Sequence, residues 1–214
     1  MKFLTLVLLI VGLMYSCASD TTPATEEATI SIDTVKLPKL PPPTPTKAEQ
    51  ITELFTKHPE FAADGFDYPV GKLNAKGYYN AQGFAGTTHL GDDWNAITGG
   101  NSDLGDPIYA VANGYVNFAE DLAGGWGNVI RVWHMIADLK TVESLYAHCD
   151  TIMVSVGDFV TKGQQIGTIG DAHGSYLAHL HLEIREDVDL PIGGGYASDK
   201  TGYLDPTSFI KAHR

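Results

Sequence analysis

The sequence has few cysteines, few basic residues and no long apolar run. With two cysteines, Cys17 and Cys149, among 214 residues, it is not a dense disulfide scaffold. Its 14 basic residues against 26 acidic ones give a net charge of −12, which argues against a nucleic-acid-binding protein because that class needs a basic face. The longest apolar run, Phe3 to Met14, is too short to cross about 30 Å of hydrocarbon, so a protein with several membrane spans is excluded.

The amino terminus has the order of regions that is typical of an export signal. Lys2 supplies the positive charge, Phe3 to Met14 the apolar region, and small residues follow. We therefore predict a signal peptide over residues 1–16 and an exported protein of the cell envelope or periplasm. Cys17 follows the apolar run as in a loose bacterial lipoprotein box, which predicts a lipidated Cys17 that anchors the protein to a membrane. Cys149 is then expected to be a small buried residue, and a Cys17 to Cys149 disulfide is the alternative.

The next two segments differ sharply in composition. Residues 17–46 are rich in Thr, Pro and Glu and end in a polyproline stretch, so we expect a disordered tether that holds a folded domain away from its anchor. Thr46 and Glu49 fit a capping box, and apolar residues follow at helical spacing until His58-Pro59. The pattern predicts an amino-terminal helical segment over residues 47–66.

The rest of the chain, residues 67–214, favours strands. Short β-rich runs are separated by Gly and Asn turns: Pro107 to Phe118, Asn128 to Met135, Ser144 to Ala147 and Leu180 to Ile184. Asp205 and Pro206 predict the start of a short closing helix. We predict a mainly β, antiparallel domain with short flanking helices.

Histidines carry the candidate chemistry. In a strand, His179 and His181 would project from the same face, although a His-x-His pair alone is weak evidence of a metal site. His89 lies four residues before Asp93, and zinc accepts both imidazole nitrogen and carboxylate oxygen. On chemistry alone, either Asp92 or Asp93 could supply the carboxylate. His148 is a further group suited to proton transfer near neutral pH.

Together these motifs resemble the lysostaphin-type, or LytM-like, zinc endopeptidases that hydrolyse peptidoglycan. The family pattern is His-x-Gly-x-Asp, then an isolated His after a strand, then His-x-His followed by Glu. The matching residues occur in the same order: His89, Gly91 and Asp93, then His148, then His179, His181 and Glu183. Glycine-rich connectors match as well, so the resemblance covers about residues 85–186.

The resemblance implies a fold and the role of each residue. It implies a compact antiparallel sheet or half-open barrel, built on a duplicated hybrid motif, with one Zn²⁺ per chain held by His89, Asp93 and His181. It assigns catalytic roles to His148 and His179. It also implies that peptidoglycan peptides are the substrate. Glu183 either orients a ligand imidazole or forms a structural ion pair with Arg131 or Arg185.

Two other classes of protein remain as alternatives. Some members of the same family lose ligands and activate cell-wall amidases without catalysis, and such a protein would have other cell-wall enzymes as partners; the complete set of five residues argues against it here. A biotinyl or lipoyl carrier shares the pattern of Gly157 to Gln164, but Lys162 lacks the neighbouring Met that this class usually has.

The remaining features receive simpler interpretations. The segment Trp94 to Leu104 is longer than in many members of the family and is expected to wall the cleft, with an inert surface loop as the alternative. His173 is a candidate groove residue, whereas His58, His134 and His213 are expected to have structural roles.

Overall fold

The computed structural model describes residues 43–86 and 88–214. The predicted signal peptide, Cys17 and residues 17–42 of the predicted tether lie outside the described residues. Within the described part, no helix has the length and apolar character needed to cross a bilayer. Residues 43–214 form one compact unit.

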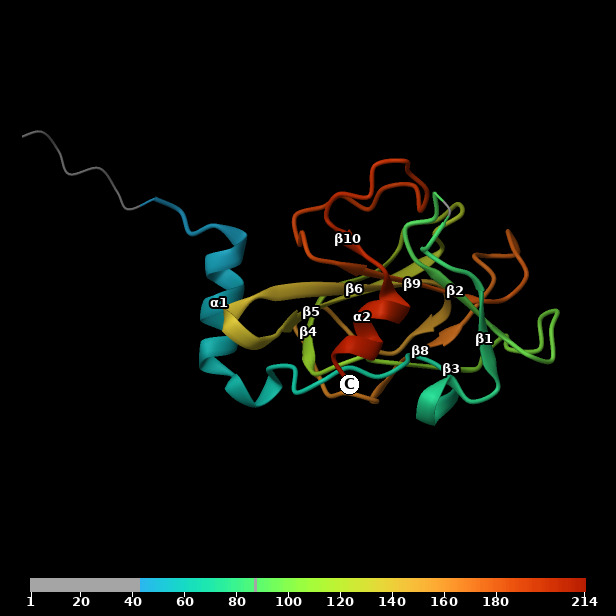
Figure 1. The fold of residues 1–214 in the computed structure, drawn as a ribbon, viewed down its shortest axis with the longest axis horizontal. Helices are drawn as coiled ribbons and strands as arrows, with labels where there is room; N and C mark the ends of the chain where they lie inside the picture. Colours follow the sequence, from blue (N-terminus) through green and yellow to red (C-terminus); the bar gives the residue numbers. More distant parts are fainter. Residues whose placement is uncertain (1–42, 87) are drawn as a thin grey trace, which may run out of the picture. The chain divides into compact units, whose positions relative to one another are not determined.

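The unit contains ten strands and two α-helices among its described residues (Figure 1). In chain order these are α1 (Lys47–Lys57), β1 (Tyr78–Gln82), β2 (Asp92–Ala96), β3 (Pro107–Tyr109), β4 (Gly114–Asp121), β5 (Asn128–Met135), β6 (Thr141–Ile152), β7 (Phe159–Val160), β8 (Gln165–Ile169), β9 (Leu180–Arg185), β10 (Tyr203–Leu204) and α2 (Pro206–Ala212). Short 3₁₀ turns cover Pro59–Phe61 and Ala137–Leu139, and a π turn covers Gly71–Ala75.

All strands pair antiparallel in one sheet. Its main path runs β1-β2-β9-β6-β5-β4-β7, with β10 also paired to β9, and with β8 paired to both β3 and β6. The sheet does not close on itself. This arrangement confirms the predicted mainly β, antiparallel fold with short flanking helices, in its open form.

The two helices begin where the sequence predicts. The Thr46 side chain accepts a hydrogen bond from the Glu49 amide, and the Glu49 carboxylate accepts one from the Thr46 amide, so the capping box is present. Asp205 caps α2 through the Ser208 amide. The first helix ends at Lys57, because Pro59 cannot continue it, so α-helix covers only the first part of the predicted segment 47–66.

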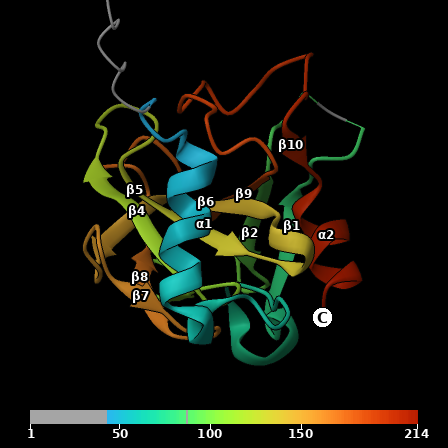
Figure 2. The same cartoon turned by 90° about the vertical axis from the view of Figure 1, so that its left-hand side faces the viewer.

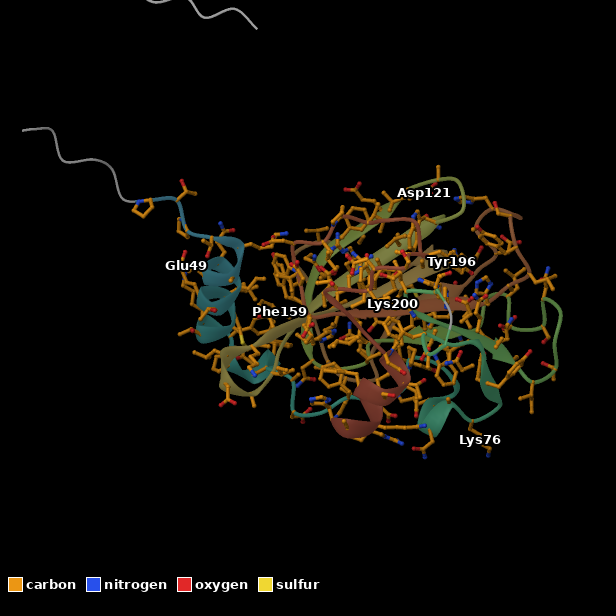
Figure 3. The ribbon with its side chains drawn as sticks, turned by 45° about the horizontal axis from the view of Figure 1, so that its top comes forward. Glu49, Lys76, Asp121, Phe159, Tyr196 and Lys200 are labelled. Carbon is orange, nitrogen blue, oxygen red and sulfur yellow. The ribbon has the colours of Figure 1, made fainter. Side chains whose placement is uncertain are left out.

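Helix α1 covers one end of the sheet. Ile51 and Phe55 on its buried face pack against Met135 at the end of β5. Figure 2 views the molecule from this side, with α1 in front of the strands. Phe159 in β7, labelled in Figure 3, stacks on Phe61 with 4.6 Å between the ring centroids. The helix and the turn after it therefore cover the end of the sheet that carries β4, β5 and β7.

Two predicted strands differ from the structure in extent. The run predicted over Pro107 to Phe118 is two strands, β3 and β4, because the chain bends between them. At the bend, the Ala110 carbonyl accepts a hydrogen bond from the Gly163 amide. The run predicted over Ser144 to Ala147 is the middle of the twelve-residue β6. By contrast, β5 has the predicted bounds.

Strand β9 lies at the centre of the molecule. It pairs with β2 and β10 on one side and with β6 on the other, and all six of its residues are buried. Leu180, Leu182 and Ile184 belong to the main hydrophobic core. The alternate residues are His181, Glu183 and Arg185, so the second face of the strand buries polar and charged groups, which requires partners for each of them.

Candidate metal centre

Three elements bring His89, Asp93 and His181 together. Asp93 in β2 lies directly opposite His181 in β9 in the antiparallel ladder. His89 precedes β2 and forms an isolated bridge with Tyr196. Gly91, between His89 and Asp93, runs so close to the Leu182 carbonyl that a Cβ would not fit there, which explains the glycine in the motif.

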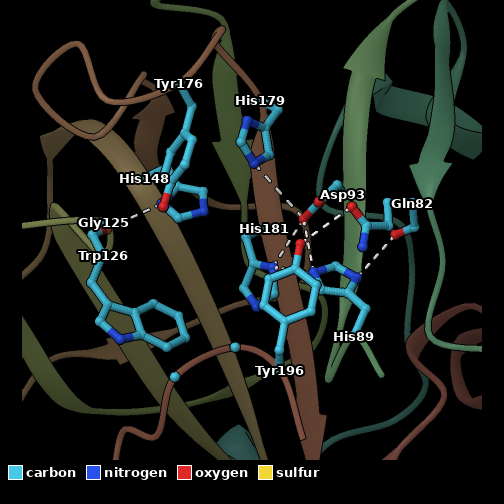
Figure 4. A pocket seen from close by; sticks show the side chains of 12 residues that line it. Gln82, His89, Asp93, Gly125, Trp126, His148, Tyr176, His179, His181 and Tyr196 are labelled. Atoms are coloured by element: carbon cyan, nitrogen blue, oxygen red, sulfur yellow. Dashed lines mark hydrogen bonds and ion pairs between the residues drawn. The ribbon is translucent and has the colours of Figure 1, made fainter. Parts of the chain in front are cut away.

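The three donor atoms form a small triangle (Figure 4). His89 Nε2 lies 3.0 Å from His181 Nδ1, His181 Nδ1 lies 2.9 Å from Asp93 Oδ1, and His89 Nε2 lies 3.3 Å from Asp93 Oδ1. Ligand atoms at about 2.0–2.1 Å from a tetrahedral zinc ion are about 3.3 Å apart. Both the chemistry and the spacing of this donor set therefore fit zinc, as they would fit other ions that accept nitrogen and oxygen ligands.

The other nitrogen of each imidazole in the triangle has a defined partner. His89 Nδ1 donates to the Gln82 carbonyl at 3.2 Å, and His181 Nε2 donates to Glu183 Oε1 at 3.1 Å. Each bond fixes a tautomer in which the nitrogen inside the triangle is the one that can coordinate a metal. The sequence left Glu183 with two alternative roles, and the structure shows both, since Arg185 pairs with its second oxygen.

The same contacts shift two pKa values. Burial alone would lower the pKa of His181, but hydrogen bonds to Asp93 and Glu183 outweigh burial and raise it to about 9. Burial would raise the pKa of Asp93, yet hydrogen bonds from His181 and His89 hold it well below its usual range. A proton thus occupies the triangle when no metal is bound, and a metal cation would displace it.

His148 enters the site from a bulge in β6. The register between β5 and β6 shifts next to it, between Asn128 and Ile130 of β5, and its φ is 62°, in the left-handed region that non-glycine residues seldom adopt. This backbone directs the imidazole toward His179, with 4.7 Å between ring centroids. Its Nδ1 donates to the Trp126 carbonyl at 3.3 Å. Burial, followed by the nearby His181 and His179, lowers the pKa of His148 to about 3, so the ring is neutral at neutral pH.

His179 lies just before β9 and is less buried than the ligands. Its Nδ1 donates to the Leu177 carbonyl at 2.8 Å, which leaves Nε2 facing the site, 3.8 Å from Asp93 Oδ1. In Figure 4, His179 and His148 stand beside the triangle of His89, Asp93 and His181. The five residues that the sequence singled out therefore share one site.

These residues line a pocket of about 460 Å³. Sequence reasoning did not assign the seven other residues that line the pocket to the site: Gln82, Gly125, Trp126, Tyr176, Gly194, Gly195 and Tyr196. The Tyr196 ring lies 5.0 Å from the His89 ring, and its hydroxyl donates to Gln82 Oε1 at 3.2 Å. The one available signal was glycine next to an aromatic residue, in Gly125-Trp126 and Gly195-Tyr196, which is common in turns of many kinds.

The two candidate carboxylates face different parts of the molecule. Asp92 accepts hydrogen bonds from the Phe84 amide and from Thr207, and so ties the start of β2 to α2. Both oxygens of Asp92 therefore have hydrogen-bond partners away from the pocket. The Asp93 side chain faces His89 and His181.

The segment Trp94 to Leu104 does not wall the pocket as expected. Among the described residues that line the pocket, none comes from this segment. Its first residues continue β2, and its turn supports the backbone beside His179: Asn101 Oδ1 accepts from the Ala178 amide at 2.9 Å, and Asn95 Nδ2 donates to the Ala178 carbonyl at 3.1 Å. The segment therefore contacts the backbone next to His179 and does not contribute to the pocket wall.

The other histidines lie outside the pocket. His173 pairs with Asp121 at 3.1 Å and, within the described part of the chain, is not among the residues lining the groove. His134 is buried between the Asn113 carbonyl and Ser144 Oγ, which confirms its structural role. His58 and His213 follow the last residues of α1 and α2. Cys149 is buried as predicted, and burial raises its pKa to about 12.

Comparison with known proteins places this site in a family. The model of peptidase family M23 matches residues 88–193, the region that contains all five residues. Lipoprotein NlpD of Yersinia enterocolitica is 42% identical over 81 residues, which are 38% of this chain and 78% of the relative. The chain belongs to peptidase family M23. This confirms the resemblance to lysostaphin-type proteins that the motifs indicate.

Further relatives and a solved structure agree with this M23 assignment. Murein hydrolase activator NlpD of Salmonella dublin is 36% identical over 100 residues, 44% of this chain but only 25% of that protein. The antimicrobial peptidase lysostaphin of Staphylococcus simulans superimposes with a TM-score of 0.52 at 24% identity, over 71% of this chain and 55% of lysostaphin. At that identity the likeness concerns the fold alone. The M23 chain thus spans most of one relative and a quarter of another.

Proposed function

We propose that this protein is a zinc-dependent endopeptidase that hydrolyses peptide bonds in the cross-links or stem peptides of peptidoglycan. The observation that carries the proposal is the triangle of His89 Nε2, Asp93 Oδ1 and His181 Nδ1, with edges of 2.9–3.3 Å, on the wall of a pocket that also holds His148 and His179. A hydrolytic zinc site has three protein ligands, which can be two nitrogens and one carboxylate oxygen, and a fourth position for a water molecule.

Each residue has a defined task in this proposal. His89, Asp93 and His181 hold the metal, whose chemistry when bound is to lower the pKa of a water molecule and to polarise the scissile carbonyl. Neutral His148, with Nδ1 bonded to Trp126 O, presents Nε2 as a proton acceptor. His179, with Nδ1 bonded to Leu177 O, presents its own Nε2 on the same side, where it can donate to or accept from the reacting groups.

A direct experiment tests the proposal. The purified full chain is analysed for zinc and incubated with purified peptidoglycan, and the released muropeptides are read by mass spectrometry beside an EDTA-treated control. We expect near one zinc per chain and peptide-bond products that EDTA abolishes. Zinc-free protein, or zinc-loaded protein without peptide products, contradicts the proposal.

A second function is favoured by the relatives rather than by the donor set. NlpD of Salmonella dublin is named a murein hydrolase activator, and so is EnvC of Escherichia coli, which is 36% identical over 92 residues. These names support the activator function more directly than catalysis. As an activator, this chain would release nothing from peptidoglycan alone but would increase release by a cell-wall amidase. Muropeptide analysis with the chain, the amidase and both together separates the two functions by the bond that is cut.

We also propose that the protein acts at the cell envelope as an exported lipoprotein. The sequence predicts a signal peptide over 1–16, a lipidated Cys17 and a tether over 17–46, and the Yersinia relative is named a lipoprotein. The catalytic domain would then occupy residues 67–214. Metabolic labelling with a fatty acid, compared between the protein and its Cys17→Ser variant, tests the anchor.

A further inference from the structure

A buried arginine stands behind the candidate metal centre. The Arg185 side chain has no exposure to solvent, although it carries a full positive charge. Its Nε and one terminal nitrogen donate to Glu183 Oε2 at 2.7 and 2.6 Å, and the guanidinium also reaches two backbone carbonyls, those of Pro191 at 3.1 Å and Ile192 at 2.9 Å. A charge buried this completely is unfavourable unless its donors are paired. Here four donor contacts reach Glu183 and the two carbonyls, and Glu143 Oε1 lies 3.9 Å from a terminal nitrogen.

This guanidinium connects two parts of the pocket. On one side it holds Glu183, whose other oxygen accepts from Nε2 of the proposed ligand His181. On the other side it holds the carbonyls of Pro191 and Ile192, one residue before Gly194, Gly195 and Tyr196, which line the pocket. Thus one side chain lies between the metal ligand and the wall of the groove.

The wall segment, residues 190–196, is also fixed at its far end. Trp126 Nε1 donates to the Gly193 carbonyl at 3.1 Å, and the Leu90 amide donates to the Gly195 carbonyl at 2.9 Å. The segment has no helix or strand of its own, so its position depends on such contacts. The planar fork of an arginine can reach a carboxylate and two carbonyls at once, which the single ammonium group of a lysine cannot do in the same geometry.

We propose that Arg185 is a positioning residue that couples the metal ligand His181, through Glu183, to the wall segment 190–196. The inference rests on the proposed metal site. Because the two contacts share one rigid group, metal binding that tightens the His181–Glu183 bond would also hold the wall segment more firmly, and the reverse holds by reciprocity. Metal loading would then shape the groove that receives the substrate.

The test compares Arg185→Gln with a matched control, Arg131→Gln. Arg131, on β5, donates to the Leu190 carbonyl at 3.0 Å and pairs with Glu143 at 2.7 Å, so it anchors the same segment but reaches Glu143 instead of Glu183. Zinc affinity is measured by competition with a chromogenic chelator, and hydrogen exchange is measured by mass spectrometry on peptides that cover 186–196.

We expect Arg185→Gln to weaken zinc binding about tenfold or more and to speed exchange in the wall segment. Arg131→Gln is expected to speed exchange but to leave zinc affinity within about threefold of the wild type. Arg185→Lys keeps the charge beside Glu183 and is expected to recover most of the zinc affinity while exchange stays fast. Wild-type zinc affinity in Arg185→Gln, or an equal loss in Arg131→Gln, overturns the coupling.

A measurement on the wild type covers the case in which Arg185→Gln does not fold. Zinc added to the metal-free full chain should slow exchange of the Ile192 and Gly193 amides, which belong to the two peptide units whose carbonyls Arg185 holds, as well as exchange beside His181. Protection confined to the ligands overturns the inference while the metal site stands. A wild type that binds no zinc overturns the proposed site and this inference together, so the two failures are told apart.

Discussion

His181 is held at both of its ring nitrogens. Nδ1 lies 2.9 Å from Asp93 Oδ1, and Nε2 donates to Glu183 at 3.1 Å, while the ring is almost fully buried. No rotation of the ring keeps both bonds, so the imidazole has one orientation. A metal bound in the triangle therefore meets a ligand that is already oriented, which favours tight binding.

Replacing this ligand should remove the metal. We expect His181→Ala to reduce zinc from near one per chain to a trace and to abolish peptide hydrolysis, because an open site with three protein ligands does not tolerate the loss of one. Elemental analysis after dialysis, with an activity assay on the same sample, measures both. Tight zinc retained at one per chain would show that His181 is not a ligand.

The neighbouring His148 should behave differently. Its Nδ1 is bonded to the Trp126 carbonyl, and it lies outside the triangle of donor atoms. We expect His148→Ala to keep its zinc and to lose about 10²–10⁴-fold in kcat, the usual contribution of a general acid or base. The zinc content of the same preparation is the control. An equal loss of metal and activity would instead make His148 a ligand.

The end of β2 and the turn that follows it hold the backbone next to His179. Asn95 and Asn101 bond the two sides of Ala178, directly before His179. We expect Asn101→Ala to leave the Ala178 amide without its acceptor, to cost about 1–3 kcal/mol in the free energy of unfolding, and to lower kcat because one of the bonds that position the backbone next to His179 is lost. Zinc content should not change.

The control for this variant is in the same turn. The hydroxyl of Ser102 bonds that of Thr98, and both residues are exposed. Ser102→Ala should therefore leave kcat and zinc content as in the wild type. If Asn101→Ala lowers stability but its kcat at full substrate matches that of Ser102→Ala, the turn is structural and does not position His179.

Local patterns predicted some of these elements and missed others. Alternation placed Leu180 and Leu182 in the core and His181 on the other face, because a strand has only two faces. Alternation could not show that β9 is an interior strand of the sheet, since this depends on β2 and β6, which pair with it from distant parts of the chain. Nor could it show the bulge at His148, where the alternation itself is interrupted.

The pocket shows the same limit. The family motif contains every residue of the donor triangle, so these could be chosen from the sequence. Trp126 and Tyr196 are not among the metal-binding or catalytic residues of the motif. They line the same pocket because Trp126 Nε1 donates to the Gly193 carbonyl, which brings the segment around Gly193 next to Trp126. Contacts of this kind, between residues 67 positions apart, are set by the whole fold.

Stability of the whole molecule should depend on pH through His134. Burial lowers the pKa of this histidine to about 4, and its bond to the Asn113 carbonyl offsets burial only in part. In the unfolded chain the pKa is about 6.5, so between pH 6.5 and 4 the unfolded chain binds a proton that the folded protein does not. The stabilising contribution is therefore complete above pH 6.5, and about 3 kcal/mol is lost as the pH falls to 4.

Urea unfolding at pH 7 and pH 4 measures this loss. EDTA-treated wild type is compared with EDTA-treated His134→Gln, so that metal release does not contribute to the difference. The variant should lose less stability between the two pH values by about 3 kcal/mol, because glutamine does not titrate. Parallel losses in the two proteins would show that His134 is not the group responsible.

Zinc itself should stabilise the whole domain, because its three proposed ligands come from separate parts of the sheet. Asp93 is on β2, His181 is on β9, and His89 bridges to Tyr196. A ligand that binds only the folded state at 1,000 times its Kd adds about 4 kcal/mol to the free energy of unfolding. For a domain of this size, that corresponds to a rise in Tm of roughly 10 °C. Thermal unfolding of metal-free protein, with and without zinc, measures the rise, and His181→Ala should show almost none. A wild type whose Tm does not respond, although elemental analysis finds zinc bound, would mean that the ion binds the unfolded chain equally well, which a site assembled from β2, β9 and the segment around His89 cannot allow.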